Sequence, residues 1–128
     1  MGVINTPKLA IFDMDGVLVD SEDTFKRACA DALHQWGVYP DYDEFTPYTG
    51  MGDILYIGGV SASHGVPYVT EMTDISYKLY GEYAKETLTV FPWSRIVPEA
   101  LHGAGIKICV ASSAGLFKVK TNIIKAIL

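Results

Sequence analysis

The sequence predicts an α/β protein in which an all-helical segment is inserted after the first strand of a parallel-sheet core. Two short apolar runs, residues 8–12 and 106–111, each end in small polar residues. This pattern is typical of strands that are buried on both faces and deliver polar groups at their carboxyl ends. Elsewhere the apolar residues recur at helical spacing. An apolar fraction of 49%, with 12 glycines and 6 prolines, excludes disordered and collagen-like chains.

The inserted segment begins with a predicted amphipathic helix, with Ser21 as its N-cap and Gly37 at its end. Its apolar positions follow the spacing i, i+3, i+4, i+7, i+8 and i+11: Phe25, Ala28, Cys29, Ala32, Leu33 and Trp36. Residues 38–68 are rich in Gly, Pro, Tyr and Asp, and predict short helices with turns around residues 50–53 and 58–59.

A second long helix is expected from about Thr70 to Glu86, with an apolar face made of Met72, Ile75, Leu79, Tyr80 and Tyr83. Residues 91–92, Phe-Pro, then mark the return to the core. The helix that follows should end near Gly103 or Gly105. Pro98 lies inside it and would cost about 3 kcal/mol at a helix interior, so we expect this helix to start late or to kink.

The chain should close with the second strand and a helix from Lys118 onward, whose apolar residues are Val119, Ile123, Ile124 and Ile127. The order is therefore strand, helical insertion, helix, strand and helix.

Charge and cysteine content narrow the partners and the compartment. The chain has 15 acidic and 10 basic side chains, and the basic ones form no cluster, which argues against nucleic acid as a partner. Cys29 and Cys109 show no repeated spacing, so we expect reduced thiols in a cytoplasmic protein. The longest uncharged stretch, residues 54–70, is broken by Gly and Pro and predicts no membrane span. No secretory signal or transit peptide is seen.

The segment Phe-Asp-Met-Asp-Gly-Val-Leu-Val-Asp-Ser-Glu, residues 12–22, carries most of the functional information. Asp13 and Asp15 lie at the carboxyl end of the first strand, where open α/β sheets bind ligands. Carboxylates this close repel each other, so either a cation neutralises them or one is protonated for acid–base chemistry. Oxygen ligands of this kind favour Mg²⁺, which binds one or two carboxylates together with waters and phosphate oxygens.

This segment resembles the first motif of the haloacid dehalogenase superfamily, in its beta-phosphoglucomutase-like branch. Residues 91–92 and 105–113, the latter Gly-Ile-Lys-Ile-Cys-Val-Ala-Ser-Ser, resemble the return to the core and the second motif of that branch. Residues 45–53 and 58–60 resemble the dehalogenase-like domain of plant suppressor-of-quenching proteins. The resemblance implies a partial Rossmann-like core, residues 1–20 and 91–128, with an inserted helical cap, residues 21–90. It also makes a plastid location an alternative.

The resemblance implies a Mg²⁺-dependent phosphatase that acts on a small phosphorylated metabolite through an aspartyl phosphate. Asp13 would be the nucleophile and a metal ligand. Asp15 would be the general acid and base, and would bind the metal through its backbone carbonyl. Ser112 would bind phosphoryl oxygens, with the Ser113 N–H nearby. The other expected phosphate- or substrate-binding positions are Gly16, Gly50 and Gly52, although a tight turn is the alternative for the last two.

Two features bear on the alternatives within the family. Carbon–halogen hydrolases of the superfamily lack the second aspartate, so Asp15 favours phosphate chemistry. Phe25 lies where sugar-phosphate mutases of this branch often place a cap histidine, so a beta-phosphoglucomutase-like mutase is the less favoured alternative.

The family's third and fourth motifs, a lysine and the acidic residues that complete the Mg²⁺ site, have no counterpart after Ser112. Lys118, Lys120 and Lys125 fall within the last predicted helix, and no Asp or Glu follows Glu99. We therefore expect an incomplete core that is inactive as this chain and self-associates through its exposed edge, consistent with a mean hydropathy of +0.20. The alternative is a non-catalytic binding protein that retains the cap and half of the core.

Overall fold

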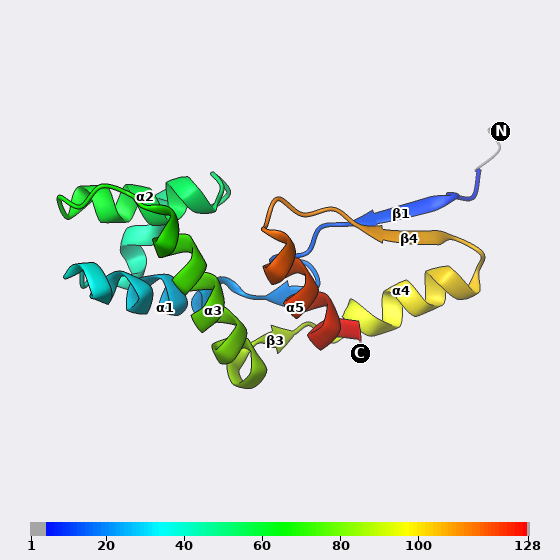
Figure 1. The fold of residues 1–128 in the computed structure, drawn as a ribbon. Coiled ribbons are helices and arrows are strands. Elements are labelled where there is room, and N and C mark those ends of the chain that lie inside the picture. Colours follow the sequence, from blue (N-terminus) through cyan, green and yellow to red (C-terminus); the bar gives the residue numbers. More distant parts are fainter. Residues whose placement is uncertain (1–4, 128) are drawn as a thin grey trace.

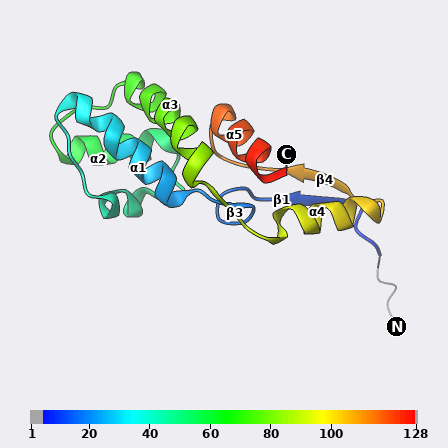
Figure 2. The same ribbon diagram turned by 90° about the horizontal axis from the view of Figure 1, so that it is seen from below.

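The computed structural model describes residues 5–127 and shows an elongated molecule (Figure 1). One end holds the helical part: helices α1 (Glu22–Leu33), α2 (Asp53–Ser63) and α3 (Thr70–Thr87). The other end holds the strands β1 (Leu9–Phe12) and β4 (Lys107–Val110) with helix α4 (Trp93–Gly103). Helix α5 (Leu116–Ile127) lies between the two ends and packs against α3 and α4 (Figure 2). The predicted α/β architecture, with helices inserted after the first strand, is confirmed.

Strands β1 and β4 pair in parallel, with Leu9 opposite Lys107 and Phe12 opposite Val110. Contrary to the prediction, these strands are not buried on both faces. Leu9 is 48% exposed and Ile11 is 62% exposed, whereas the alternate residues of both strands are half-buried. Among residues 5–127 this sheet has only two strands. A sheet buried on both faces needs a layer of helices on each, and the face that carries Leu9 and Ile11 is left uncovered.

A second, antiparallel pair was not predicted. Strand β2 (Val19–Asp20) pairs with β3 (Thr89–Val90). The segment that leads from the β1–β4 sheet into the helical part therefore lies beside the segment that leads back (Figure 1). Two-residue strands are too short to give an alternating pattern in the sequence.

The helical part is built around the contact between α1 and α3. Helix α1 ends at Leu33, and a 3-10 turn, η1 (His34–Trp36), continues to Gly37, whose φ of +73° ends the helix as expected. The predicted second helix is confirmed and extends one residue further, to Thr87. The aromatic core is continuous, since Phe25 and Phe45 both stack on Tyr56, at centroid distances of 5.4 and 5.0 Å.

The turn expected at Gly58 and Gly59 is wrong, because both glycines lie inside α2. Their role is close packing rather than chain reversal: a Cβ at Gly59 would collide with the Tyr48 ring, and one at Gly58 would lie 3.1 Å from Cβ of Tyr68. Tyr48 ends the 3-10 helix η2 (Tyr42–Tyr48), which begins in a capping box.

Two further boundaries differ from the predictions. Helix α4 starts at Trp93 and contains Pro98, so it does not start late. Helix α5 starts at Leu116, two residues before Lys118. Within residues 5–127, no helix combines the length and the apolar character needed to span a membrane.

Candidate active site

One cavity of about 300 Å³ lies where the carboxyl ends of β1 and β4 face the helical part. Because the two strands are parallel neighbours, the residues that follow them meet at the same edge of the sheet. The cavity is lined by all seven residues that the sequence predicted for the site: Asp13, Asp15, Gly16, Gly50, Gly52, Ser112 and Ser113. The structure therefore brings these residues together, while the role of each stays a prediction.

The loop after β1 holds Asp13 through its own backbone. Oδ1 of Asp13 accepts a hydrogen bond from the Met14 N–H at 2.8 Å, and the Met14 side chain is fully buried. The chain then turns at Gly16, whose φ of +76° is a left-handed conformation that favours glycine. The Gly16 N–H donates to the Val19 carbonyl at 2.8 Å, which closes the loop. Only one oxygen of the Asp13 carboxylate is engaged by a donor among the described residues.

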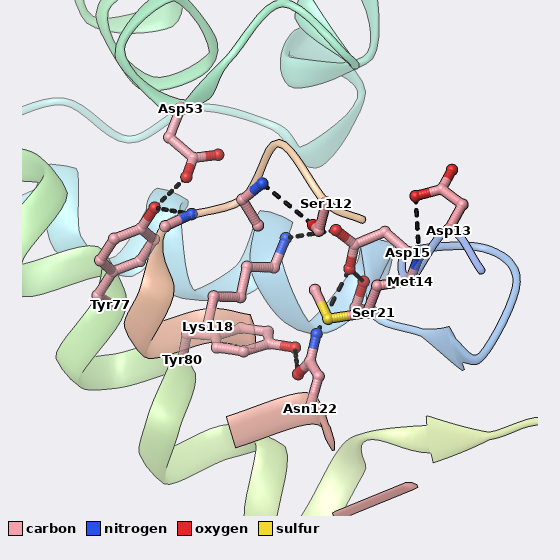
Figure 3. Close-up of polar contacts among 12 residues, drawn as sticks. Asp13, Met14, Asp15, Ser21, Asp53, Tyr77, Tyr80, Ser112, Lys118 and Asn122 are labelled. Carbon is pink, nitrogen blue, oxygen red and sulfur yellow. Dashed lines mark hydrogen bonds and ion pairs between the residues drawn. The ribbon is translucent and has the colours of Figure 1, made fainter. Parts of the chain in front are cut away.

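The Asp15 carboxylate is held much more firmly (Figure 3). The Ser21 hydroxyl donates to Oδ1 at 2.5 Å, and Asn122 Nδ2 lies at 3.4 Å from the same oxygen. Lys118 Nζ lies 3.6 Å from Oδ2. Ser21 is the N-cap residue of α1, as predicted, but its hydroxyl makes no cap bond with the helix and donates to Asp15 instead.

Helix α5 contributes to this site in a way that the sequence did not predict. The buried positions of this helix are Lys118, Asn122 and Ala126, at i, i+4 and i+8. Of the predicted apolar residues, Val119 and Ile123 pack against the core, Ile124 is 58% exposed, and the side chain of Ile127 lies outside the described part. The i, i+4 spacing of Lys118 and Asn122 was the sequence signal that these two polar side chains lie on one face of the helix.

Lys118 reaches the cavity along an aromatic surface. Its side chain is 7% exposed, and Nζ lies 4.1 Å from the Phe25 ring centroid and 5.5 Å from that of Tyr80. Cation–π contacts of this kind stabilise an ammonium group away from water. The Tyr80 hydroxyl donates to Asn122 Oδ1, which orients the Asn122 amide toward Asp15 (Figure 3). The two α5 side chains are therefore fixed by the aromatic core of the helical part.

The helical part and the loop after β4 are joined by Tyr77. Its hydroxyl donates to Asp53 Oδ2 and accepts a hydrogen bond from the Gly115 N–H at 3.1 Å (Figure 3). Burial, together with the hydrogen bond to Asp53, raises the pKa of Tyr77 well above its usual range. In the same loop, Ser112 Oγ accepts from the Ala114 N–H at 3.1 Å, so this hydroxyl both shapes the turn and faces the cavity.

The predicted Mg²⁺ site is only partly present. No group of three or more His, Cys, Asp or Glu residues that could hold a metal ion occurs in the described part of the chain. Asp13 offers a carboxylate with a free oxygen, but the Asp15 carboxylate is already bonded to Ser21 and paired with Lys118. These residues do not by themselves form a complete Mg²⁺ site.

The geometry agrees with a comparison against families of known proteins. Residues 7–127 match the model of a hydrolase family, the haloacid dehalogenase-like hydrolases. The chain belongs to the haloacid dehalogenase-like hydrolase family. The resemblance inferred from residues 12–22 and 105–113 is thereby confirmed.

This haloacid dehalogenase-like chain is also similar to individual relatives and solved structures. It is 35% identical over 117 residues to Protein SUPPRESSOR OF QUENCHING 1, chloroplastic, of Arabidopsis thaliana, a match that covers 88% of the chain and 11% of that protein. CbbY from Rhodobacter sphaeroides, solved in complex with phosphate, superposes with a TM-score of 0.77 at 19% identity, covering 92% of the chain and 56% of CbbY.

A predicted phosphoglycolate phosphatase from Haemophilus somnus superposes with a TM-score of 0.71 at 18% identity, covering 93% of the chain and 57% of that structure. At such identities the likeness to solved structures concerns the fold. The haloacid dehalogenase-like chain spans little more than half the length of these solved structures and about a tenth of the Arabidopsis protein.

Proposed function

We propose that this chain carries the nucleophile-bearing half of a phosphatase site that acts on a small phosphorylated metabolite. The observation that carries the proposal is the cavity in which Asp13, Asp15 and Ser112 meet at the carboxyl ends of two parallel strands. Membership of a hydrolase family supports it, and phosphate chemistry is in keeping with the neighbouring structures.

In the proposed reaction the free carboxylate oxygen of Asp13 attacks phosphorus, and the bond to the leaving oxygen breaks. Asp15 gives its proton to the leaving oxygen and then takes a proton from the water that hydrolyses the aspartyl phosphate. The Ser112 hydroxyl and the Lys118 ammonium group bind the phosphoryl oxygens. The Lys118, Ser21 and Asn122 contacts hold Asp15 in one orientation for both proton transfers.

Mg²⁺ is the metal that we propose, because hydrolases of this family generally use it. From this chain it would be held by the Asp13 carboxylate and the Asp15 backbone carbonyl. The missing acidic ligands are the reason why we propose that these residues alone do not sustain turnover.

One observation favours the phosphatase over the mutase. Phe25 is 5% exposed, stacks on Tyr56 and makes an edge contact with Tyr80, so the position that could hold a mutase histidine is part of the aromatic core. A non-catalytic protein that binds a phosphorylated ligand remains the second candidate, favoured by the incomplete metal site.

We also propose a domain organisation, a class of partner and a cellular location for the protein. We propose a helical cap of residues 21–90 and a partial core of residues 1–20 and 91–128. For the partner we propose a small metabolite rather than a nucleic acid or a membrane, in keeping with the net charge of -5. The unpaired thiols of Cys29 and Cys109 support a cytoplasmic location, and the chloroplastic Arabidopsis relative makes a plastid the alternative.

The 128-residue chain is expected to hydrolyse no p-nitrophenyl phosphate above the buffer rate in the presence of Mg²⁺, because the described residues lack the remaining metal ligands. The release of p-nitrophenolate measures this. Turnover that Asp13→Asn abolishes would show that the site is complete after all.

A measurement of phosphate binding distinguishes the two candidate functions, the phosphatase and the non-catalytic protein that binds a phosphorylated ligand, from a protein that has neither function. Inorganic phosphate is expected to shift the backbone amide signals of residues 13–16 and 112–114 in ¹H–¹⁵N NMR spectra. If phosphate leaves these signals unchanged, the phosphatase proposal fails.

We also propose that the chain self-associates through the uncovered face and edges of the β1–β4 sheet. Leu9 and Ile11 supply exposed apolar surface there, and open strand edges can pair with another chain. Ile11→Lys is expected to shift the molar mass measured by light scattering toward the monomer. Ile54→Lys is the matched control, because Ile54 is 61% exposed but lies on α2. A wild-type chain that is monomeric at all concentrations would contradict the proposal.

A further inference from the structure

The charges that line the cavity are strongly unbalanced. Five of the lining residues described are acidic, and a single one is a lysine or arginine, Lys118; the acidic ones are Asp13, Asp15, Asp20, Glu22 and Asp53. The whole chain is also acidic, with a net charge of -5. Since clefts with low-dielectric walls concentrate the field of their charges, this cavity disfavours anions except close to the lysine.

The lysine is confined to the end of the cavity near the two catalytic candidates. Lys118 Nζ lies 3.6 Å from Asp15 and over the Phe25 ring, and the side chain is nearly inaccessible to solvent. It therefore cannot swing across the cavity to meet a second anion. One anionic group, the phosphoryl group beside Asp13 and Asp15, can use this cation.

The opposite side of the cavity, formed by the helical part, presents aromatic rings, glycines and one carboxylate. Tyr48 and Tyr56 line it with Gly50 and Gly52, and Asp53 stands at the start of α2. One oxygen of Asp53 accepts the Tyr77 hydroxyl, and the other has no donor among the described residues (Figure 3). A second anionic group on a substrate would meet this carboxylate.

Lys26, a second lysine beside a lining residue, is already engaged. Lys26 Nζ lies 3.2 Å from Glu22 Oε1 and donates to Thr46 Oγ1 at 3.1 Å, and Lys26 does not line the cavity. It reduces the charge of Glu22 but leaves Asp53 uncompensated. Within the described part of the chain, Asp53 is therefore an unpaired carboxylate on the side of the cavity formed by the helical part, where a second anion would meet it.

We propose that this site, if it is the phosphatase site proposed above, selects phosphomonoesters whose phosphoryl group is the sole anionic group. The remainder of the substrate is a small uncharged body, such as a short polyol, that lies against Tyr48 and Tyr56. A bisphosphate or a phosphorylated carboxylic acid is rejected by like-charge repulsion from Asp53, since specificity follows from repulsive as well as attractive contacts. A cavity of about 300 Å³ suits a small ligand.

A matched pair of ligands tests this selectivity. Glycerol 3-phosphate and 3-phosphoglycerate differ only in that a hydroxymethyl group is replaced by a carboxylate. Their affinities for the 128-residue chain are measured by titration of the amide signals of residues 13–16 and 112–114 in the presence of Mg²⁺. We expect glycerol 3-phosphate to bind at least about tenfold more tightly.

Variants assign the effect to Asp53. Asp53→Asn keeps an acceptor for the Tyr77 hydroxyl but removes the charge, so the affinity ratio should fall toward one. Glu22→Gln is a second variant at a lining residue, whose side chain is 52% exposed and already paired with Lys26, so it should reduce the ratio less than Asp53→Asn does. Asp74→Asn removes the same charge from α3 outside the cavity and should leave the ratio unchanged.

The outcomes separate the two proposals. Equal affinities, or tighter binding of 3-phosphoglycerate, overturn the selectivity and leave the phosphatase proposal standing. If neither ligand nor inorganic phosphate shifts the amide signals, the phosphatase proposal fails, and the selectivity that rests on it fails too. A tenfold ratio that Asp53→Asn does not reduce overturns the assignment to Asp53.

Discussion

Lys118→Met is expected to weaken the binding of inorganic phosphate to this chain by at least about tenfold, or about 1.4 kcal/mol. Lys118 is the sole lysine or arginine among the described residues that line the cavity, and five acidic residues would remain without it. A hydrogen bond between an ammonium group and a phosphoryl oxygen contributes about 1.5–3 kcal/mol. Methionine keeps an apolar stem against Phe25 and Tyr80, so the packing should be preserved. Titration of the amide signals of residues 13–16 gives the affinity.

Lys120→Met is the matched control for this variant. Lys120 lies two residues further along α5 and is exposed, so its loss removes the same charge without changing the cavity. Its phosphate affinity should stay within about twofold of the wild type, since a distant exposed charge is largely screened by salt. If Lys118→Met folds and binds phosphate as tightly as Lys120→Met, Lys118 is not part of the anion site.

Phe45→Ala is expected to lower the free energy of unfolding by about 3–5 kcal/mol. Phe45 is fully buried and stacks on Tyr56, which in turn stacks on Phe25 beside the cavity. Removing its ring leaves a void in the aromatic core that joins η2 to α1 and α2. Since whole domains are stable by about 5–15 kcal/mol, the variant should retain little stability. Urea unfolding followed by far-ultraviolet circular dichroism gives the value.

Tyr42→Ala supplies the comparison for Phe45→Ala. Tyr42 belongs to the same 3-10 helix but is 47% exposed, so truncation creates no buried void. Its effect should remain within about 0.5 kcal/mol, as for most surface substitutions. A loss below about 1 kcal/mol for Phe45→Ala would contradict the position of its ring in the core.

The parts that the sequence could predict are those determined by long or local patterns. The helix over residues 70–87 has an apolar repeat sustained over about three turns, from Met72 to Tyr83, and its bounds were predicted to within one residue. Asp13 and Asp15 were predicted to lie at a ligand-binding edge because they follow the first strand of an open α/β sheet, and the resemblance to the haloacid dehalogenase superfamily added Ser112 to that site. Neither inference needs knowledge of distant contacts.

The parts that it could not predict depend on which distant side chains meet. Gly58 and Gly59 suggested a turn, but they serve the close approach of the Tyr68 and Tyr48 rings to α2. A lysine in an amphipathic helix ordinarily lies in solvent, yet Lys118 lies against the aromatic core and reaches Asp15. Long aliphatic stems allow lysine to do this, and only the packed structure shows where the charged end lies.

The pairing of β1 with β4 joins positions about 100 residues apart, with the whole helical part in the intervening loop. Contacts between distant positions form late, because the loop must close before they are gained. During synthesis, α1, α2 and α3 can therefore pack before β4 has left the ribosome. Until then β1 has no partner strand, and the backbone edge that later pairs with β4 is open to other chains, so β1 needs protection from aggregation while the helical part is being made.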